Sequence, residues 1–343
     1  GTQVGEGRGV FHAPIFAAAA RACKRIGASW ATAREMNFHE SGSMGRIDRA
    51  ALFVFSGRMK LLPVLCGGLF FLTPASAQLR CLESDTTIEV RNGDALVMRY
   101  HKQPSEEAAK NDPLYTRTGY IHPLCTPSGK VITGDYAPDH PHQPGLFFAW
   151  TKTTFDGRAP EFWNQKQGSG RVSYVKTLAI HSGAGETGFD VVHRYEDLTA
   201  PGGAVPVLDE TWKVRVSLVE GRYQIDLHSS QQCVGTKPLV IEKYHYGGMA
   251  IRGNAAWLDE VPDRIVSNEG KDRVAGNHTR PRWVKMAGQL EGASCGIVAI
   301  PHPDNFRAPQ WVRLHPSKPY FVFSPMVEEP FTIEPGKTYE SRF

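Results

Sequence analysis

The sequence predicts an all-β protein whose main part is one antiparallel β-sandwich, and three observations support this fold class. Short runs of β-branched, aromatic and aliphatic residues recur along the chain after residue 77. Gly, Pro and Asn bound these runs, as they do where a chain turns between strands. Helical periodicity over three turns is nearly absent from the same stretch. This combination is typical of antiparallel sandwiches and barrels.

The chain begins with two segments that we expect to lie outside the sandwich. Residues 59–77, "MKLLPVLCGGLFFLTPASA", have the pattern of a signal peptide: Lys60 is followed by an apolar core and by the cleavage pattern Ala75-Ser76-Ala77. Residues 1–58 show no clear domain pattern, and we interpret them as upstream, non-native, disordered translation. A small Ala-rich helical module is the alternative for them. Residues 78–343 then form a single domain in the periplasm or outside the cell.

The first strands of that domain form a predicted hairpin. In "TTIEVRNGDALVMRY", residues 86–100, two β-branched or apolar runs flank Asn92-Gly93-Asp94. Asn and Gly accept the positive φ that tight hairpin turns require. The next segment, "SEEAAK" at Ser105–Lys110, is the one short helix that we expect.

A second, longer hairpin is predicted over residues 207–233, with its turn at Glu220-Gly221-Arg222. Strands at residues 171–183 and 187–198 precede it. Alternation gives the first strand of the hairpin one wet and one buried face. The wet face carries Thr211, Lys213, Arg215 and Ser217, and the buried face carries Trp212, Val214, Val216 and Leu218.

The C-terminal part continues the same pattern of strands and turns. Strands are expected within residues 237–253, 293–303 and 319–327, each bounded by Gly or Pro. The final stretch, "IEPGKTYESRF", predicts a Pro-Gly turn that leads into a strand, and the sequence stops inside that strand. We therefore expect a domain truncated at its C-terminus, in which a missing final strand leaves an unpaired sheet edge.

Charge and cysteine content exclude some classes of protein. Residues 1–77 hold nine of the 39 basic and four of the 35 acidic residues, which leaves 30 basic against 31 acidic residues in the domain. No basic tract with interleaved aromatic residues remains there, so nucleic acid is not an expected partner. The domain has four widely spaced cysteines, Cys81, Cys125, Cys233 and Cys295. We expect buried thiols rather than a disulfide framework.

The stretch "PDHPHQPGLFFAW" gathers titratable side chains at the start of an apolar strand. His140 and His142 are two residues apart, and in an extended segment both imidazoles would face the same side. Asp139 could orient one of the rings for proton transfer or metal ligation. His122, at the end of another strand across a short loop, is expected to join them. A purely structural role in rigidifying the strand entrance is the alternative.

Glu210 is the fifth candidate for acid–base catalysis. In "LDETW" it lies between apolar residues and shares the side of Trp212 by alternation. A carboxylate on a buried face is costly unless it is paired or hydrogen-bonded, so Glu210 is either a general acid or base or the partner of a structural arginine.

Residues suited to the recognition of sugar hydroxyls or carboxylates accumulate in the C-terminal half. Planar rings can stack on a sugar, and forked donors can bind its oxygens. The candidate substrate-binding residues are His245, Tyr246, Arg252, Arg282, Trp283, His302, Asn305 and Arg307. Paired glycines after Tyr246 allow a bulge or a close backbone approach. The sequence contains no GxSxG, P-loop, GxGxxG or HExxH motif to support nucleotide-dependent or serine-hydrolase chemistry.

The segments "YIHPLCTPSGKVITGDYAPDHPHQPGLFFAW", "YHYGGMAIRG", "RPRWVKMAG" and "GIVAIPHPDNFRAPQW" together resemble a family of secreted bacterial proteins named "methane oxygenase PmoA", otherwise a domain of unknown function. The resemblance covers most of residues 86–343. It implies association with sugar-degrading enzymes and, by fold analogy, a sandwich similar to the supersandwich of galactose mutarotases. The label suggests a membrane subunit, yet residues 78–343 contain no apolar run of 18 residues.

This chain departs from the pattern of the resembled family at several positions. Gln143 and Pro144 replace a histidine and an arginine, Cys125 replaces a tyrosine, and Lys285 replaces an acidic residue. These differences weigh against a strict three-histidine metal site.

We therefore expect a secreted or periplasmic enzyme that acts on a glycoside or modified sugar by His/Glu acid–base chemistry. It would bind a small molecule or oligosaccharide, require no cofactor and have no membrane span after signal cleavage. A non-catalytic carbohydrate-binding module is the alternative, and a metal-dependent oxygenase with a divalent metal at His140 and His142 is the third hypothesis.

Overall fold

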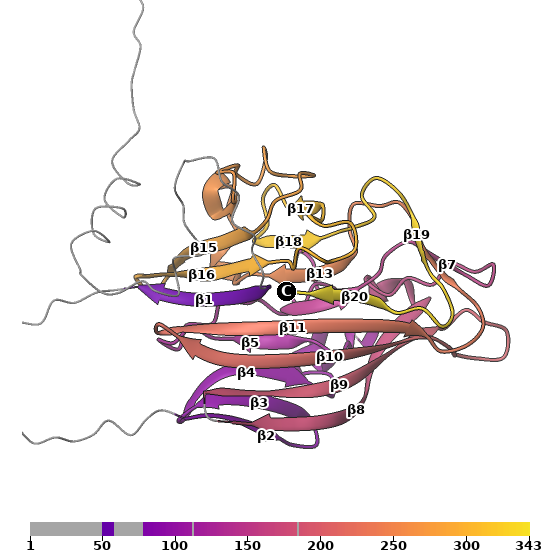
Figure 1. Ribbon diagram of the computed structural model, residues 1–343, viewed down its shortest axis with the longest axis horizontal. Coiled ribbons are helices and arrows are strands. Elements are labelled where there is room, and N and C mark those ends of the chain that lie inside the picture. The colour runs from indigo at the N-terminus through magenta and orange to yellow at the C-terminus, as the bar shows by residue number, and fades with distance from the viewer. Residues whose placement is uncertain (1–49, 58–77, 112, 184) are drawn as a thin grey trace, which may run out of the picture. The chain divides into compact units, whose positions relative to one another are not determined.

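The computed structural model describes residues 50–57, 78–111, 113–183 and 185–343, which form two large antiparallel β-sheets and one small one (Figure 1). The nine-stranded sheet contains, in spatial order, β14 (Ile265–Ser267), β15 (Val284–Leu290), β16 (Ala293–Ile300), β1 (Ala51–Gly57), β11 (Arg222–Cys233), β10 (Val205–Val219), β9 (Glu186–Asp197) and β8 (Gly170–Ser182), and β20 (Tyr339–Arg342) also pairs with β11.

The second large sheet has eight strands, and a three-stranded sheet accompanies the two. The eight-stranded order is β17 (Val312–Leu314), β18 (Tyr320–Phe323), β13 (Gly248–Arg252), β6 (Leu146–Ala149), β5 (Ile121–Leu124), β4 (Ala95–His101), β3 (Thr87–Asn92) and β2 (Leu79–Glu83). The small sheet contains β19 (Phe331–Ile333), β12 (Leu239–Ile241) and β7 (Thr153–Phe155).

The two large sheets pack face to face and enclose the main hydrophobic core. In Figure 1, β8 to β11 lie in front of β2 to β5. Tyr100 of the eight-stranded sheet contacts Phe189 and Trp212 of the nine-stranded sheet, with ring centroids 5.2 and 6.4 Å apart. All three side chains are fully buried. The prediction of an all-β antiparallel sandwich is therefore confirmed.

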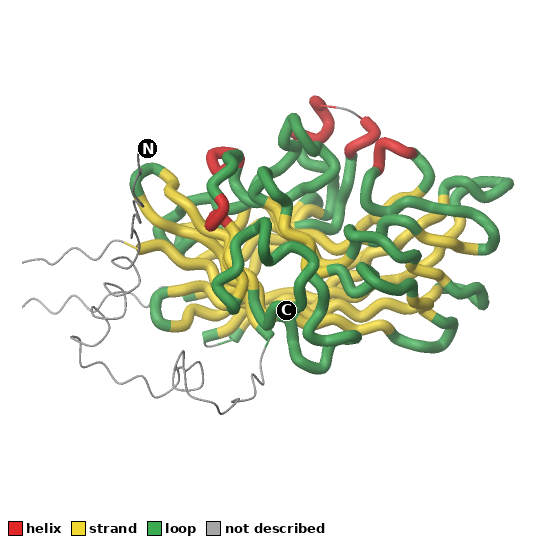
Figure 2. The backbone as a smooth tube through the Cα atoms, turned by 90° about the horizontal axis from the view of Figure 1, so that it is seen from above, coloured by secondary structure: helices red, strands yellow, loops and turns green. Residues whose placement is uncertain are grey.

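In the part of the chain that the structure describes, helical structure occurs as short segments in the connecting loops, as Figure 2 shows. They are α2 (Glu106–Asn111) and the 3-10 turns η2 (Pro113–Tyr115), η3 (Gln165–Gln167), η4 (Ala255–Trp257) and η5 (Pro262–Arg264). The short helix predicted at residues 105–110 corresponds to α2. Within the described ranges no helix is long and apolar enough to cross a membrane.

Both predicted hairpins are present. β3 and β4 pair around Gly93, whose φ is +59°, and β10 and β11 pair along twelve residues each around Glu220 and Gly221. Alternation correctly predicts the buried face of β10 except at its end. Leu218, expected to be buried, is 41% exposed because it lies next to the turn, where the hairpin extends past the core.

The nine-stranded sheet includes a strand from the segment that the sequence analysis placed outside the domain. β1 pairs antiparallel with both β11 and β16, and its Leu52 and Val54 are fully buried. β20 pairs with the neighbouring stretch of the same edge of β11, also antiparallel, so β20 and β1 lie in line and run in one direction.

Two other expectations concern the ends of the chain and its thiols. The proposed signal peptide, residues 59–77, lies outside the described residues. The four cysteines of the domain are free, and Cys81, Cys125 and Cys295 are buried. This agrees with the prediction of buried thiols. Burial raises the pKa of the Cys81 thiol to about 12 and that of the Cys125 thiol to about 11.

Candidate functional site on the outer face of the eight-stranded sheet

A second apolar cluster covers the outer face of the eight-stranded sheet, the face that points away from the main core. Alternate side chains of its strands belong to this cluster, while the others fill the core. Trp163, from the loop between β7 and β8, packs over it with its ring centroid 4.7 Å from that of Phe147 and 6.1 Å from that of Tyr320. We call this cluster the aromatic floor; its members are Tyr120, Phe147, Ala149, Trp163, Ala250, Tyr320 and Val322.

Strand register places Arg252 beside Tyr320 on the aromatic floor. Met249 and Ile251 of β13 point into the main core, so alternation directs Arg252 to the outer face. Arg252 pairs with Tyr320 of β18, and the two residues are only 1% and 0% exposed. A guanidinium buried to this degree requires hydrogen-bond and charge partners.

The segment Pro138–Gln143 approaches the floor as two consecutive turns. The backbone N–H groups of His140 and Gln143 each donate to the carbonyl oxygen three residues earlier, at 2.9 and 3.1 Å. Pro138 and Pro141 occupy the second position of these turns, where their fixed φ is favourable. The extended segment that the sequence analysis expected is therefore replaced by turns. The two imidazoles still lie together, with ring centroids 5.5 Å apart.

Asp139 connects this segment to the buried arginine. Its Oδ1 accepts a hydrogen bond from Arg252 Nη2 at 2.8 Å, and its Oδ2 lies 3.0 Å from His140 Nδ1 and 3.6 Å from Lys318 Nζ. Burial alone would raise the pKa of Asp139, but the hydrogen bonds from Arg252 and His140 and the charges of Arg252 and Lys318 lower it to about 2. Asp139 is therefore ionised at neutral pH and orients the His140 ring.

Two more histidines extend this polar cluster. The His315 ring lies 5.7 Å from the His140 ring, edge to face. Burial, assisted by the charges of His140 and Arg252, lowers the pKa of His142 to about 4. Burial, together with the charges of Arg313 and His140, does the same for His315. Both rings are therefore neutral at pH 7.

Tyr246 and Arg313 form the other end of the site. The Arg313 guanidinium carbon lies 5.6 Å from the centre of the Tyr246 ring, in a cation–π contact. His245 and His278 lie alongside, with ring centroids 6.2 Å apart. Burial and the Arg313 charge lower the pKa of both histidines.

The two glycines after Tyr246 allow the backbone there to adopt a conformation and a close approach that other residues could not. Gly247 and Gly248 have φ values of +128° and +115°. A Cβ on Gly248 would lie 2.1 Å from the carbonyl oxygen of Phe323. Because only glycine tolerates both this φ and this approach, the close backbone contact expected from the paired glycines is present.

Three polar atoms on the floor have no hydrogen-bond partner among the residues that the structure describes. They are Arg252 Nε, Arg313 Nε and the Tyr320 hydroxyl. The Tyr320 hydroxyl lies within electrostatic reach of both guanidinium groups and of Tyr246: burial and Tyr246 raise its pKa well above the ordinary value, while Arg313 and Arg252 oppose this. Buried polar atoms are almost always paired, so this arrangement can receive the acceptor oxygens of a ligand.

His122 belongs to a neighbouring group rather than to the His140 cluster. Its Nδ1 lies 2.9 Å from Thr133 Oγ1, and its backbone oxygen lies 2.7 Å from His101 Nε2. Burial and the charges of His101 and Arg99 lower the pKa of His122 to about 4. The described contacts do not join His122 to His140 or His142.

Glu210 lies in the main core, away from the outer face. Its Oε2 accepts a hydrogen bond from Tyr195 Oη at 3.0 Å and lies 3.2 Å from His193 Nδ1. Its Oε1 accepts hydrogen bonds from Ser229 and Gln231. The carboxylate and these partners are buried between the sheets. The sequence correctly predicts a buried carboxylate that needs partners. Its hydrogen-bond partners are neither an arginine nor His140 and His142, although the buried guanidinium of Arg117 interacts with it electrostatically.

The remaining sequence candidates lie elsewhere and have local partners. Arg307 donates to the carbonyl oxygens of Pro325, Glu329 and Pro330. Asn305 exchanges two hydrogen bonds with the backbone of Arg342 in β20.

Three candidates remain besides these. Arg282 is exposed before β15, and Trp283 precedes β15 directly. His302 lies beside β20, where its backbone N–H donates to the oxygen of Arg342 at 3.0 Å. No described contact joins Arg282 or His302 to the aromatic floor.

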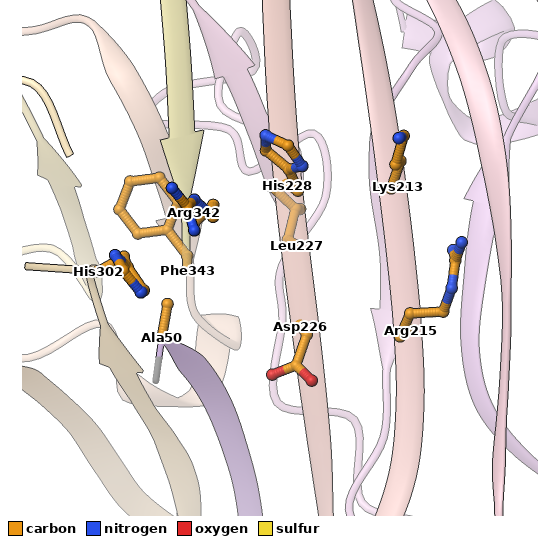
Figure 3. Close-up of a pocket in the computed structure, with 9 residues that line it drawn as sticks. All are labelled: Ala50, Lys213, Arg215, Asp226, Leu227, His228, His302, Arg342 and Phe343. Atoms are coloured by element: carbon orange, nitrogen blue, oxygen red, sulfur yellow. The ribbon is translucent and has the colours of Figure 1, made fainter. Parts of the chain in front are cut away.

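A cavity of about 380 Å³ lies on the nine-stranded sheet, where β20 and β1 meet end to end (Figure 3). It is lined by Ala50, Lys213, Arg215, Asp226, Leu227, His228, His302, Arg342 and Phe343. His302 is the only residue proposed from the sequence that contributes to it. Its Arg215 is already paired with Asp190 at 2.6 Å, whereas the Nε2 atom of its His228 is buried without a hydrogen-bond partner among the described residues.

The histidine cluster is not arranged as a metal-binding site in the part of the chain that the structure describes. Within the described ranges, no group of three or more His, Cys, Asp or Glu side chains is arranged to hold a metal ion. At the position where the resembled family has a third histidine, Gln143 is 1% exposed and its Oε1 accepts a long hydrogen bond of 3.5 Å from Arg252. Gln143 therefore supports the arginine.

Sequence reasoning missed Trp163, Arg313, His315, Lys318 and Tyr320, together with His278 and the other members of the aromatic floor. The pattern "RLHPSKPY" contains four of them within eight residues. This density of Arg, His and Lys at the start of an apolar strand could have identified the site. It resembles the concentration of titratable residues in "PDHPHQPGLFFAW".

The fold and the site define a two-sheet β-sandwich protein with a polar site built over an aromatic floor on the outer face of one sheet. Residues 87–343 match the model of DUF6807, a family of unknown function, and the chain belongs to that family. The matched region includes every residue of the site. No curated protein and no solved structure matches the chain.

Proposed function

We propose that this protein is a secreted or periplasmic carbohydrate-active protein, and that it is an enzyme acting on a glycoside or a modified sugar. One observation carries the proposal: Arg252 Nε and the Tyr320 hydroxyl are buried beside an aromatic floor and have no acceptor among the described residues. A sugar offers apolar ring faces for aromatic contact and hydroxyl oxygens for such donors. The resemblance to the family named after PmoA supports the link to sugar degradation, not the oxygenase label.

His140 is the proposed proton-transfer group. Asp139 accepts from its Nδ1, which leaves Nε2 free to take or give a proton. Asp139 itself, with its pKa lowered to about 2, stays ionised and cannot act as a general acid near neutral pH. A pair of catalytic carboxylates, as in most glycoside hydrolases, is not available from Glu210 because it lies in the core. The arrangement therefore favours histidine-based proton transfer.

A non-catalytic carbohydrate-binding protein is the second candidate. It is favoured by the contacts of Asp139, whose two carboxylate oxygens already interact with Arg252, His140 and Lys318. A carboxylate engaged in this way contributes to a rigid binding surface as readily as to a catalytic pair.

Substitution of His140 separates the two candidates. The His140→Ala variant should lose about 100- to 10,000-fold of the turnover of native or oxidised glycosides, because general acid–base catalysis contributes about this much. Its Kd for the same sugar should change only a few-fold. His181→Ala is the matched control, because His181 also pairs with an aspartate, Asp190 at 3.1 Å, but lies on β8.

Calorimetry and turnover assays on one sugar panel provide the readout. Binding without turnover in the unaltered protein supports the binding-protein candidate. Absence of any thermal shift with every sugar of the panel contradicts both.

A further inference from the structure

We propose that the site selects a sugar that carries a carboxylate, with the carboxylate bound at Arg313 and the sugar ring beside Tyr246. This inference rests on the proposed function and adds the chemical class of the ligand. It follows from the state of Arg313, from the charge of its surroundings and from the neighbouring ring.

The guanidinium group of Arg313 is hydrogen-bonded through one nitrogen and has no acceptor at another. Nη1 donates to the carbonyl oxygen of Leu314 at 3.0 Å, whereas Nε is buried and has no acceptor among the described residues. No ion pair with a described carboxylate is formed by Arg313. Arg252, by contrast, is neutralised by Asp139. Arg313 is therefore the cation of the site that lacks a counter-ion.

The surroundings of Arg313 add donors rather than anions. The Tyr320 hydroxyl is fully buried without an acceptor, and it lies within electrostatic reach of Arg313 and Arg252. The neighbouring rings are those of His245 and His278. A guanidinium edge binds a carboxylate through two parallel hydrogen bonds, and a buried hydroxyl beside it can supply a third.

Tyr246 connects the anion to a sugar ring. The contact between its ring and the guanidinium, at 5.6 Å, holds Arg313 in one orientation. Tyr246 also lies 6.0 Å from Trp163 and 5.9 Å from Tyr320, so it continues the aromatic floor at a half-exposed position. A pyranose over this surface would direct a carboxylate attached to its ring toward Arg313, which is the chemistry of a uronic acid.

Calorimetry with the full chain tests the proposal with three probes: trigalacturonate, its methyl ester and a neutral trisaccharide. The free acid should bind at least about tenfold more tightly than its ester, because a hydrogen-bonded charge pair contributes about this much or more. The preference should shrink in high salt. Arg313→Gln should weaken binding of the acid about 10- to 100-fold and weaken binding of the neutral probe far less, with Arg313→Lys in between.

Arg171→Gln is the control variant, because Arg171 is an exposed arginine paired with Glu196 on the nine-stranded sheet. Unfolding curves confirm that each variant is folded before its affinity is interpreted. Equal binding of the acid and its ester, or equal losses for all probes in Arg313→Gln, overturns the carboxylate inference while the proposed function stands. Failure of all three probes to bind, together with the wider sugar panel, overturns both.

Discussion

The carboxylate of Glu210 is the most completely hydrogen-bonded acidic group between the two sheets among those that the structure describes. Tyr195, Ser229 and Gln231 donate to it, and His193 contacts it at 3.2 Å. The network continues outward, since the Tyr100 hydroxyl lies 2.6 Å from His193 Nε2. Burial would raise the pKa of Glu210, but the contacts with His193, Ser229 and Gln231 lower it instead. The network therefore joins the two sheets.

Removal of this carboxylate should destabilise the protein strongly. We expect Glu210→Ala to lower the free energy of unfolding by about 3–5 kcal/mol, because it leaves several buried donors without an acceptor. Asp209→Asn is the matched control: Asp209 pairs with Arg194 on the half-exposed face and should cost less than about 1 kcal/mol. Urea unfolding measures both variants, and a similar loss in the two would contradict a special role for Glu210.

At the residue scale, local sequence identifies candidates but not their partners. The proximity of His140 and His142 follows from their spacing, and the burial of Glu210 follows from alternation. Whether Glu210 meets those histidines depends on which sheet β10 joins, which local sequence does not specify. Arg252 and Tyr320 are 68 positions apart and become neighbours only through the pairing of β13 with β18.

Among the elements, β1 has the most unexpected position. It lies between β11 and β16 with Leu52 opposite Ile225 on one side and Ala299 on the other. Strand β20 occupies the preceding stretch of the same edge of β11. Pairing on both sides satisfies backbone groups that a sheet edge would otherwise expose.

We expect the sheet to depend on β1 for stability. Leu52→Ala should cost about 2–5 kcal/mol of unfolding free energy, because it deletes a fully buried side chain. Ser56→Ala, at a half-exposed position of the same strand, should stay within about 0.5 kcal/mol. Guanidinium melts of both variants and of a chain that lacks residues 1–57 provide the test. Unchanged midpoints for Leu52→Ala and for the shortened chain would show that the domain is stable without β1.

At the scale of the whole molecule, buried neutral histidines link stability to pH. Burial lowers the pKa of His101, His122, His142 and His315 to about 4 in the folded protein. In the unfolded chain histidines titrate near 6.5. Between these two values the unfolded state binds more protons, so stability falls as the pH is lowered through this window.

Each such histidine should reduce the free energy of unfolding by at most about 1.4 kcal/mol per pH unit between about pH 6.5 and 4. The loss should be smaller for partly exposed rings. Urea unfolding from pH 7.5 to 4.5 measures the slope, and His142→Gln should flatten it. Stability that is constant from pH 7 to 5, or an unchanged slope in His142→Gln, would contradict this prediction.

The sequence by itself determined the all-β class, both long hairpins, the short helix and the free cysteines. These features depend on period-two alternation, turn residues and spacing, which act over a few residues. Only the tertiary structure decided that Glu210 lies in the core, that β1 joins the sheet, and that Arg313 and Tyr320 belong to the site. Those outcomes depend on which distant strands pair and in what register, and that choice is made by packing across the whole sandwich rather than by any local run of residues.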